Sequence, residues 1–346
     1  MGIKFTILAI LFVSSNIDAR PISYSGGSTL MMFSDSMKDS VYYHYSPTYK
    51  YSVGIEQVKN NYFKDGSSYL RLTYLANRKN TQNSQRNLYF QSGLSPNGVD
   101  DYFYGIHGDW ETRRWFVGFG LKEVKKEKIG FSQQHLQFGV APYLGEYGDL
   151  HTWLMVKTNK NSLNNDWSTY PVIKFFKGVS LIEFGYNNKT EWDVNYIYRF
   201  LRGNIMKLIG VFLFLFSSWA VASDHSNDHM DHSDMMHHSH EGHLHEKLVD
   251  GEKLIVNPEK FDKFISGLTN AQVAVVSVKG MVCDFCARGI EKTFQKDKRV
   301  KRIDVDLGQG KVLVAFDKGI DINFEDIKKK ILANGQNATG MQIVSI

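Results

Sequence analysis

Residues 191–200 alternate between two kinds of side chain, and this period of two constrains the fold more than any other feature of the sequence. One face of the segment carries Trp192, Val194, Tyr196, Tyr198 and Phe200. The opposite face carries Glu191, Asp193, Asn195, Ile197 and Arg199. Such alternation predicts a β-strand with one apolar and one mostly polar face. The length fits a tilted membrane-spanning strand, and aromatic residues at both ends of the apolar face are typical of the girdles of membrane barrels.

The same alternation recurs through residues 20–200. Further apolar sets on one face are Trp115, Val117, Phe119 and Leu121; Leu136, Phe138 and Val140; and Leu70, Leu72 and Tyr74. Clusters of Gly, Pro, Asn and Asp separate these segments as turns do. We therefore expect residues 20–200 to form an all-β antiparallel membrane β-barrel of about 10–12 strands, and favour twelve because membrane barrels usually have an even number.

The last of these strands ends on an aromatic residue, in the sequence YIYRF that closes on Phe200. This ending resembles the C-terminal signature by which the assembly machinery recognises bacterial outer-membrane barrels. The resemblance implies that Phe200 was originally a chain end and that residues 20–200 contact outer-membrane lipid. Nothing among the polar positions of the strands identifies a transported substrate.

Two segments have the features of export signals. Residues 1–19 combine Lys4 with an apolar core and a small-residue cleavage site at Ala19, as a secretory signal peptide does. After a spacer at 201–205, residues 206–222 repeat the pattern with Lys207, an apolar run and the triplet Ala-Val-Ala that ends at Ala222. The second run is short for a membrane helix, which needs about 20 residues, yet an uncleaved anchor stays open as the alternative to an internal signal peptide.

A signal-like segment in the middle of a chain needs an explanation, and the simplest is the fusion of two neighbouring secretory genes into one reading frame. The composition changes at the same place, because aromatic residues lie mostly before residue 217 whereas most of the 12 His follow it. The net charge of +5 is small and forms no basic block, so a nucleic-acid partner is not expected.

Residues 223–246 are crowded with metal-binding side chains. The candidate ligands are His225, His229, Met230, His232, Met235, Met236, His237, His238, His240, His243 and His245. Imidazole suits copper, zinc and nickel, and thioether sulfur favours Cu(I), so the mixture points to copper. The segment lacks apolar periodicity and is expected to be a disordered metal-binding arm, with a merely solvated linker as the alternative.

The rest of the chain predicts a small α+β domain. Residues 247–270 form a linker in which Asn257 and Pro258 begin a short amphipathic helix. Within residues 271–346 the pattern alternates between strand and helix periods in the order βαββαβ, which is a ferredoxin-like fold with an antiparallel sheet and two helices on one face.

The only two cysteines of the chain, Cys283 and Cys286, lie where the first strand of this domain passes into its first helix. Two such thiols can converge on one ion, and a helix N-terminus favours their thiolate forms. Two sulfur ligands suit a soft ion such as Cu(I), whereas zinc prefers four ligands.

The run Gly280-Met281-x-Cys283-x-x-Cys286 and the order of elements resemble the heavy-metal-associated (HMA) domain of copper chaperones, copper-exporting ATPases and the periplasmic mercury-binding protein. The resemblance covers residues 271–346 and implies that Cys283 and Cys286 bind the metal, that Met281 packs under the loop, and that the ion passes to a partner protein by thiolate exchange. Val282 and residues 334–336 depart from the common family pattern, which leaves the choice of ion open.

The sequence therefore favours an exported heavy-metal-binding and transfer protein joined to an outer-membrane barrel, with the barrel in the outer membrane and residues 223–346 in the periplasm. The expected cargo is Cu(I), with mercury as the alternative. A pore or structural barrel with an appended metal domain is a further alternative for the first half. We do not expect an enzyme, because Gly-Met before the first cysteine is a feature of metal loops rather than of thiol-disulfide oxidoreductases.

Overall fold

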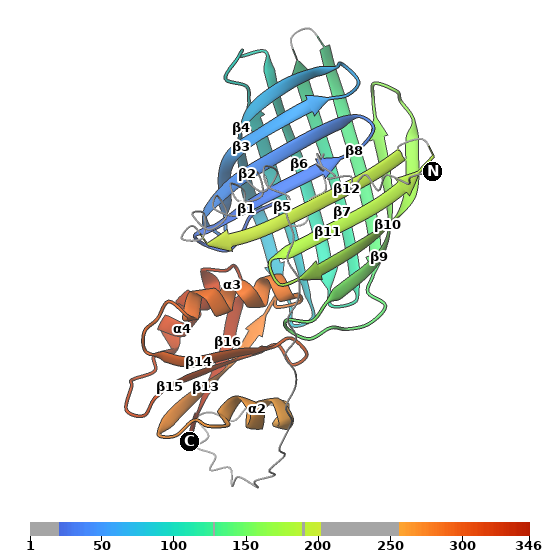
Figure 1. Ribbon diagram of the computed structural model, residues 1–346. Coiled ribbons are helices and arrows are strands. Elements are labelled where there is room, and N and C mark those ends of the chain that lie inside the picture. Colours follow the sequence, from blue (N-terminus) through green and yellow to red (C-terminus); the bar gives the residue numbers. More distant parts are fainter. Residues whose placement is uncertain (1–20, 127–128, 189–190, 202–255) are drawn as a thin grey trace, which may run out of the picture.

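A computed structural model of the chain describes residues 21–126, 129–188, 191–201 and 256–346. These residues form a closed β-barrel and a smaller α/β domain that packs against one end of it (Figure 1). The predicted signal peptides at 1–19 and 206–222, the spacer after residue 201 and the arm at 223–246 lie outside the described residues. So do the first residues of the predicted linker, up to residue 255.

Twelve antiparallel strands make the barrel, each bonded to its neighbours in sequence, and β1 closes the sheet on β12. The strands are β1 (Gly27–Ser34), β2 (Lys38–Thr48), β3 (Tyr51–Asn60), β4 (Asp65–Asn80), β5 (Ser84–Leu94), β6 (Asp101–Thr112), β7 (Trp115–Lys126), β8 (Ile129–Val140), β9 (His151–Asn161), β10 (Trp167–Lys177), β11 (Ser180–Asn187) and β12 (Glu191–Leu201). The predicted barrel and the favoured count of twelve strands are confirmed.

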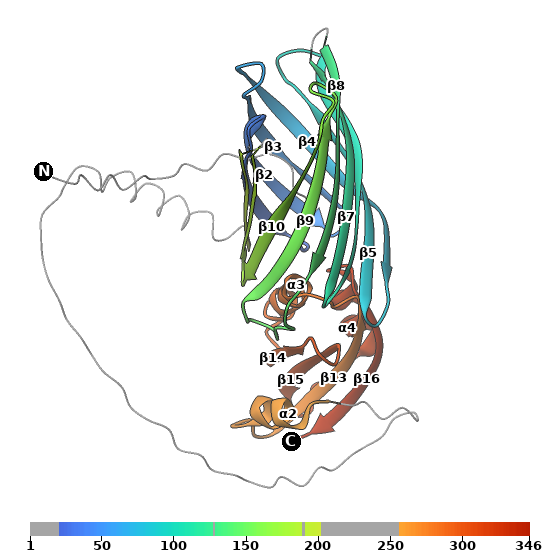
Figure 2. The same cartoon turned by 90° about the vertical axis from the view of Figure 1, so that its right-hand side faces the viewer.

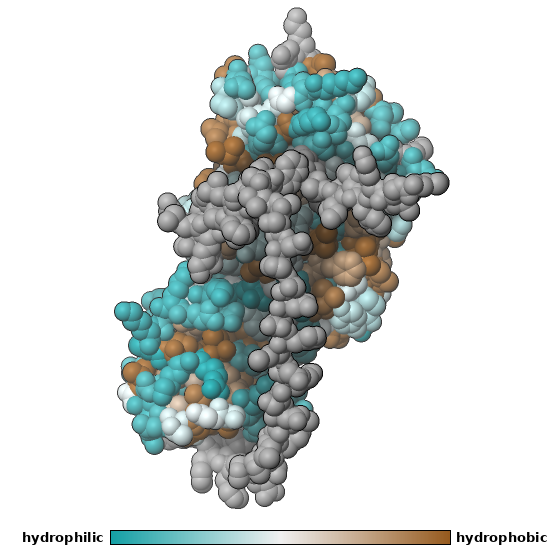
Figure 3. All heavy atoms as spheres, in the orientation of Figure 1, coloured by the Kyte–Doolittle hydropathy of each residue, from teal (hydrophilic) through white to brown (hydrophobic). Residues whose placement is uncertain are grey.

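The outer surface of the barrel is apolar and its interior polar, the reverse of a water-soluble protein. Leu121 on β7 is 47% exposed and Phe138 on β8 is 50% exposed, whereas Lys122, the next residue along β7, is 7% exposed. Hydrophobic residues lie on the flank of the barrel, and hydrophilic residues gather at the end away from the α/β domain (Figure 3). An apolar outer band around a polar interior is the arrangement of a membrane barrel.

Strand β12 follows the predicted alternation with two variations, because Val194 and Phe200 on the predicted apolar face are both buried. Trp192 is 53% exposed, and Asp193 and Asn195 are buried as expected for the interior face. Phe200 lies on the predicted apolar face but is buried, with its ring 5.8 Å from that of Tyr198 and 6.4 Å from that of Tyr43. The aromatic end of the strand is therefore part of a ring cluster on the closing seam of the barrel.

Both ends of the barrel sequence lie at the same end of the molecule, because Gly27 of β1 pairs with Leu201 of β12. We call this the terminal end. The connections there span residues 49–50, 81–83, 113–114, 141–150 and 178–179, so all but one are two or three residues long. The connections at the opposite end have two to six residues, so the longest connection of the barrel, 141–150, lies at the terminal end.

Side chains meet across the interior of the barrel. Lys157 on β9 forms an ion pair of 2.6 Å with Asp193 on β12, although two strands separate them in the sheet. A second group, drawn from β3, β4, β6, β7 and β8, consists of Val58, Tyr69, Phe103, Val124 and Phe131. Charged and apolar side chains therefore contact one another across the interior of the barrel.

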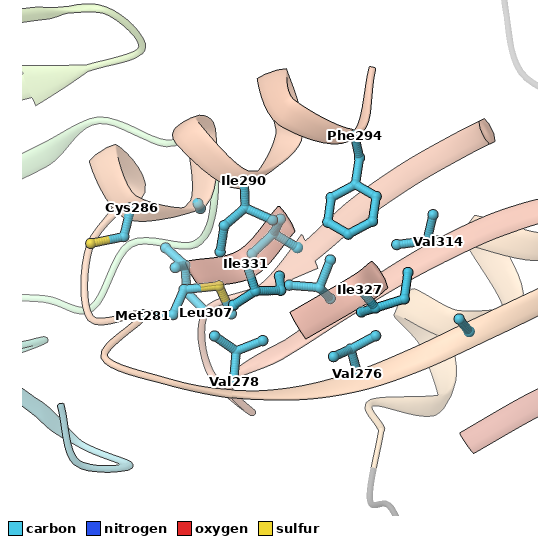
Figure 4. Packing of buried hydrophobic residues seen from close by; sticks show 14 of the residues in the cluster. Val276, Val278, Met281, Cys286, Ile290, Phe294, Leu307, Val314, Ile327 and Ile331 are labelled. Atoms are coloured by element: carbon cyan, nitrogen blue, oxygen red, sulfur yellow. The ribbon is translucent and has the colours of Figure 1, made fainter. Parts of the chain in front are cut away.

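The α/β domain has the predicted βαββαβ order. Its elements are β13 (Ala271–Lys279), α3 (Asp284–Phe294), β14 (Val300–Asp306), β15 (Lys311–Asp317), α4 (Phe324–Leu332) and β16 (Asn337–Ser345). The strands form an antiparallel sheet in the order β14-β15-β13-β16. Helices α3 and α4 cover one face, where Ile290, Phe294 and Ile331 pack on Val276 and Val314 (Figure 4).

A third helix, α2 (Pro258–Ile265), covers the opposite face of this sheet. Asn257 caps it, since its side chain accepts a hydrogen bond of 3.2 Å from the backbone N–H of Lys260, and Pro258 occupies the first turn, where its missing N–H is tolerated. Phe261 and Phe264 are buried against the sheet. The predicted short helix thus belongs to the domain that follows it. Within the described ranges, no helix is long and apolar enough to span a bilayer.

Candidate metal site

The loop between β13 and α3, residues 280–283, is held by one residue that turns the chain and one that anchors it. Gly280 has a φ of +83°, a left-handed conformation that favours glycine. A Cβ at this position would lie 2.3 Å from Oδ1 of Asn80 on the barrel, so the space also requires glycine. Met281 is 2% exposed and points into the core, near Leu307 (Figure 4).

The two cysteines lie together at the N-terminal end of α3. Cys283 is the N-cap residue, and its carbonyl accepts a hydrogen bond of 3.1 Å from the N–H of Cys286. Neither thiol is in a disulfide. Cys283 is half-buried and Cys286 is 3% exposed, with its sulfur directed away from the core residues (Figure 4). Both sulfurs are therefore close to the positive end of the helix dipole, where thiolates are favoured.

Asp284, the first residue of α3, is completely buried and has two partners. It forms an ion pair of 3.1 Å with Arg288 one turn along the helix, and its other oxygen accepts a hydrogen bond of 2.6 Å from the N–H of Gly148. Burial disfavours the charge of Arg288, but Tyr147 and Asp284 outweigh it and hold the pKa of Arg288 above its ordinary value. The helix end beside the cysteines is thus fixed by a buried carboxylate.

The donors at this site are two sulfurs. No group of three or more His, Cys, Asp or Glu side chains within the described parts of the chain is placed to share a metal ion. A pair of thiolates suits a soft ion that accepts few ligands, whereas structural zinc takes four. The candidate ligands from His225 to His245 lie outside the described residues, so the structure neither brings them to the cysteines nor separates them.

The site faces the terminal end of the barrel. A cavity between the two parts is lined by Val282 and Cys283 from the loop at 280–283, which we call the metal loop, and by Phe285 from α3. Glu111, His151 and Arg199 line it from the barrel. A smaller cavity beside Cys286 is lined on the barrel side by Ile22, Tyr24, Tyr49 and Arg78. In both views of the molecule, α3 and α4 lie nearest the barrel and α2 lies farther away (Figures 1 and 2).

Sequence reasoning did not anticipate these barrel neighbours. Asn80, Arg199 and the loop at 141–150 are far from the cysteines in the chain, and no local pattern links them to the metal loop. The one available signal was the position of the barrel termini, since a strand that ends at the terminal end delivers the following chain to that end.

Comparisons with known proteins support the interpretation of the second part of the chain. Residues 275–335 match the model of the heavy-metal-associated domain. No curated protein matches the chain. A solved structure from a study of the in-meso crystallization of membrane proteins aligns with 51% of this chain and 84% of its own, at 10% identity and a TM-score of 0.32, which is too low a likeness to carry an argument. Residues 275–335 are a heavy-metal-associated domain, and the region before it is a closed antiparallel barrel of twelve strands.

Proposed function

We propose that the chain binds Cu(I) through Cys283 and Cys286 and passes it to a partner protein by thiolate exchange. The observation that carries the proposal is the placement of both sulfurs at the start of α3, on a loop held from below by Met281. Two thiolates at the positive end of a helix form a soft, low-coordinate site. The match to the heavy-metal-associated domain supports heavy-metal binding in general.

The His and Met residues at 225–245 act in this proposal as a capture arm. Weak, multiple imidazole and thioether ligands would raise the local metal concentration beside the stronger cysteine site. Mercury is the alternative cargo, because it would use the same thiolates while making less use of imidazole.

We place the barrel in the bacterial outer membrane and the metal domain in the periplasm. The apolar outer band supports a place in a membrane. Residues 1–19 would direct export as a first signal peptide. Residues 206–222 would act as a second one in a chain that is cleaved after Ala222. The ion pairs and packed rings inside the barrel favour a structural role over an open pore.

Metal titration of the exported, purified chain tests the proposal. With Cu(I) and a competing chelator, one ion is expected to bind tightly, and Cys283→Ser or Cys286→Ser is expected to weaken that binding by at least a hundredfold. Met281→Leu is the control, because it conserves core volume and removes a thioether that the proposal places in packing rather than in the ligand set. Tight Cu(I) binding by the Cys283→Ser/Cys286→Ser chain would overturn the proposal.

Competition between Cu(I) and Hg(II), with residues 223–246 present or deleted, separates the two cargoes. Copper is expected to load both the arm and the cysteine pair, so deletion lowers its stoichiometry; mercury is expected to load chiefly the pair. A non-enzymatic role predicts no turnover of a dithiol substrate by the metal-free chain, and sustained thiol-disulfide turnover would contradict it.

A further inference from the structure

The contact between the two parts of the molecule is formed by hydrogen bonds from specific polar groups. Gln85 Nε2 donates to the carbonyl of Gly280 at 3.1 Å, and the N–H of Gly280 donates to the carbonyl of Thr81 at 2.9 Å. Asn80 Nδ2 donates to the carbonyl of Gly335 at 2.8 Å and to the side chain of Asn337 at 2.7 Å. The turn between β4 and β5 therefore binds the backbone of the metal loop itself.

A second set of contacts comes from the longest connection at the terminal end, residues 141–150. The hydroxyl of Tyr147 donates to Glu291 on α3, and the N–H of Gly148 donates to Asp284. Glu146 accepts a hydrogen bond of 2.5 Å from Lys260 on α2. This loop thus reaches α2 and α3 and holds the domain from a second side.

Phe285, which lies between the two cysteines, enters the end of the barrel. Its ring packs against a cluster of Phe176, Leu181 and Ile197 that belongs to β10, β11 and β12. The guanidinium carbon of Arg199 lies 4.0 Å from the centre of the same ring. An aromatic anchor in a pocket beside a cation is a favourable docking contact.

Docking covers the metal site. Cys286 is 3% exposed although its sulfur points away from the core of its own domain, and the cavity beside it is walled by barrel residues such as Tyr24 and Arg78. A thiolate enclosed in this way cannot reach a second protein, and thiolate exchange requires direct access to the sulfur.

We propose that the terminal end of the barrel is a docking surface for the metal-binding face of the domain, and that the docked arrangement shields Cys286 until the domain separates. The occupant of this surface is the chain's own residues 280–291 and 334–337. The consequence for transfer rests on the proposed function, but the docking itself does not. Shielding would keep a reactive thiol away from wrong partners in an oxidising compartment.

The test measures the alkylation rate of Cys286 in the metal-free, full-length chain folded in detergent, with Cys283→Ser leaving a single thiol. The undocking variant carries Asn80→Arg and Glu146→Lys, both on the barrel, so the fold of the metal domain is untouched. The longer side chain of Asn80→Arg would intrude on Gly280, where Asn80 already leaves no room for a Cβ. The new positive charge of Glu146→Lys would repel Lys260.

The matched control carries Asn97→Arg and Asp100→Lys. Both residues are exposed in the connection between β5 and β6 at the opposite end of the barrel, so the control makes the same changes of charge and similar changes of residue size away from the docking contacts. Gel migration before and after heating shows that each barrel is folded and each chain intact.

We expect alkylation of Cys286 to be at least tenfold faster in the undocking variant than in the parent, and unchanged in the control. Equal rates in parent and undocking variant would overturn the proposal, as would a parent chain that reacts as fast as the denatured protein. No metal is present in this experiment, so a failure of docking is distinguishable from a failure of metal binding.

Discussion

The guanidinium carbon of Arg199 on β12 lies 4.0 Å from the centre of the ring of Phe285, the residue before Cys286. The last strand of the barrel therefore contacts the helix that carries Cys286, although more than eighty residues of chain separate them. This contact joins two parts whose sequences are otherwise distinct in composition.

Leu121 tests whether the apolar outer face meets lipid. It lies near the middle of β7 and is 47% exposed. Leu121→Arg is expected to destabilise the barrel in lipid vesicles by about 2–4 kcal/mol, the effect of Arg near a bilayer midplane. Glu123→Arg, on the same face but nearer the strand end, is the depth control and should have a smaller effect. Equilibrium unfolding in urea measures both, and equal losses would argue against a membrane-embedded surface.

Lys157 tests whether the interior ion pairs hold the barrel together. Its ammonium group lies 2.6 Å from Asp193, both side chains are almost completely buried, and Asp193 also accepts a hydrogen bond from Tyr170. Lys157→Met leaves a buried carboxylate without its cation and is expected to destabilise the folded barrel by about 3–5 kcal/mol. Adding Asp193→Asn to the same chain should recover part of this loss. Denaturant unfolding in detergent, followed by tryptophan fluorescence, gives both free energies of unfolding. If the second substitution recovers no stability, the loss comes from the changed shape of the side chain and not from the unpaired charge.

The barrel was predictable because apolar and polar side chains alternate along most of its strands. Leu70, Leu72 and Tyr74, for example, are all exposed as the pattern required. The metal domain was predictable because apolar residues recur with different spacings in its helices and its strands. Ile290 and Phe294 lie one helical turn apart, whereas the strands are rich in valine. Each of these signals is local, since it depends only on which face of one element is buried.

The docking of the parts was not predictable, because it depends on contacts without a local pattern. Gly280 gave a motif signal for the metal loop, but nothing in the sequence indicated that Gln85 and Thr81 would bond to its backbone. Likewise Tyr147 and Gly148 belong to the connection at 141–150, whose sequence indicates only a turn. The assignment of Cys283 and Cys286 as ligands remains a prediction that the metal titration tests.

Phe264 tests the packing of α2 on the sheet face away from the metal site. It is 4% exposed and contacts the cluster that includes Val273, Val275 and Leu313. Phe264→Ala is expected to lower the stability of the metal domain by about 3–5 kcal/mol while leaving the Cu(I) stoichiometry unchanged below the unfolding transition. Lys263→Ala, at the neighbouring exposed position, should have little effect. Thermal unfolding of the intact chain with and without Cu(I) provides the measurement, and a stability loss confined to the metal-bound form would contradict the packing role.

The ion pair between Glu146 and Lys260 predicts how docking depends on pH. Burial raises the pKa of Glu146, but hydrogen bonds and charge from Lys260 and Arg113 outweigh it and hold that pKa below its ordinary 4.5. Burial lowers the pKa of Lys260, but Glu146 and Asp306, with Asp304, hold it above its ordinary 10.5. Arg113 is on the barrel, and both aspartates are in the metal domain, so only the mutual effect of Glu146 and Lys260 is lost on separation.

The direction of the pH effect follows from these shifts. A carboxyl whose pKa is lower in the docked than in the separated state stabilises docking above its separated-state pKa, and this contribution is lost as the pH falls through the docked value. An ammonium group whose pKa is higher in the docked state stabilises docking below its separated-state pKa, and this contribution is lost as the pH rises through the docked value. Docking is therefore expected to be strongest between these limits.

Distances between spin labels at Tyr143→Cys on the barrel and Lys318→Cys on the metal domain, in a chain with Cys283→Ser and Cys286→Ser, report the docked fraction. Glu146→Gln should lower the docked fraction at neutral pH and reduce its further loss as the pH falls. An unchanged loss of the docked fraction at acidic pH would show that another group controls it.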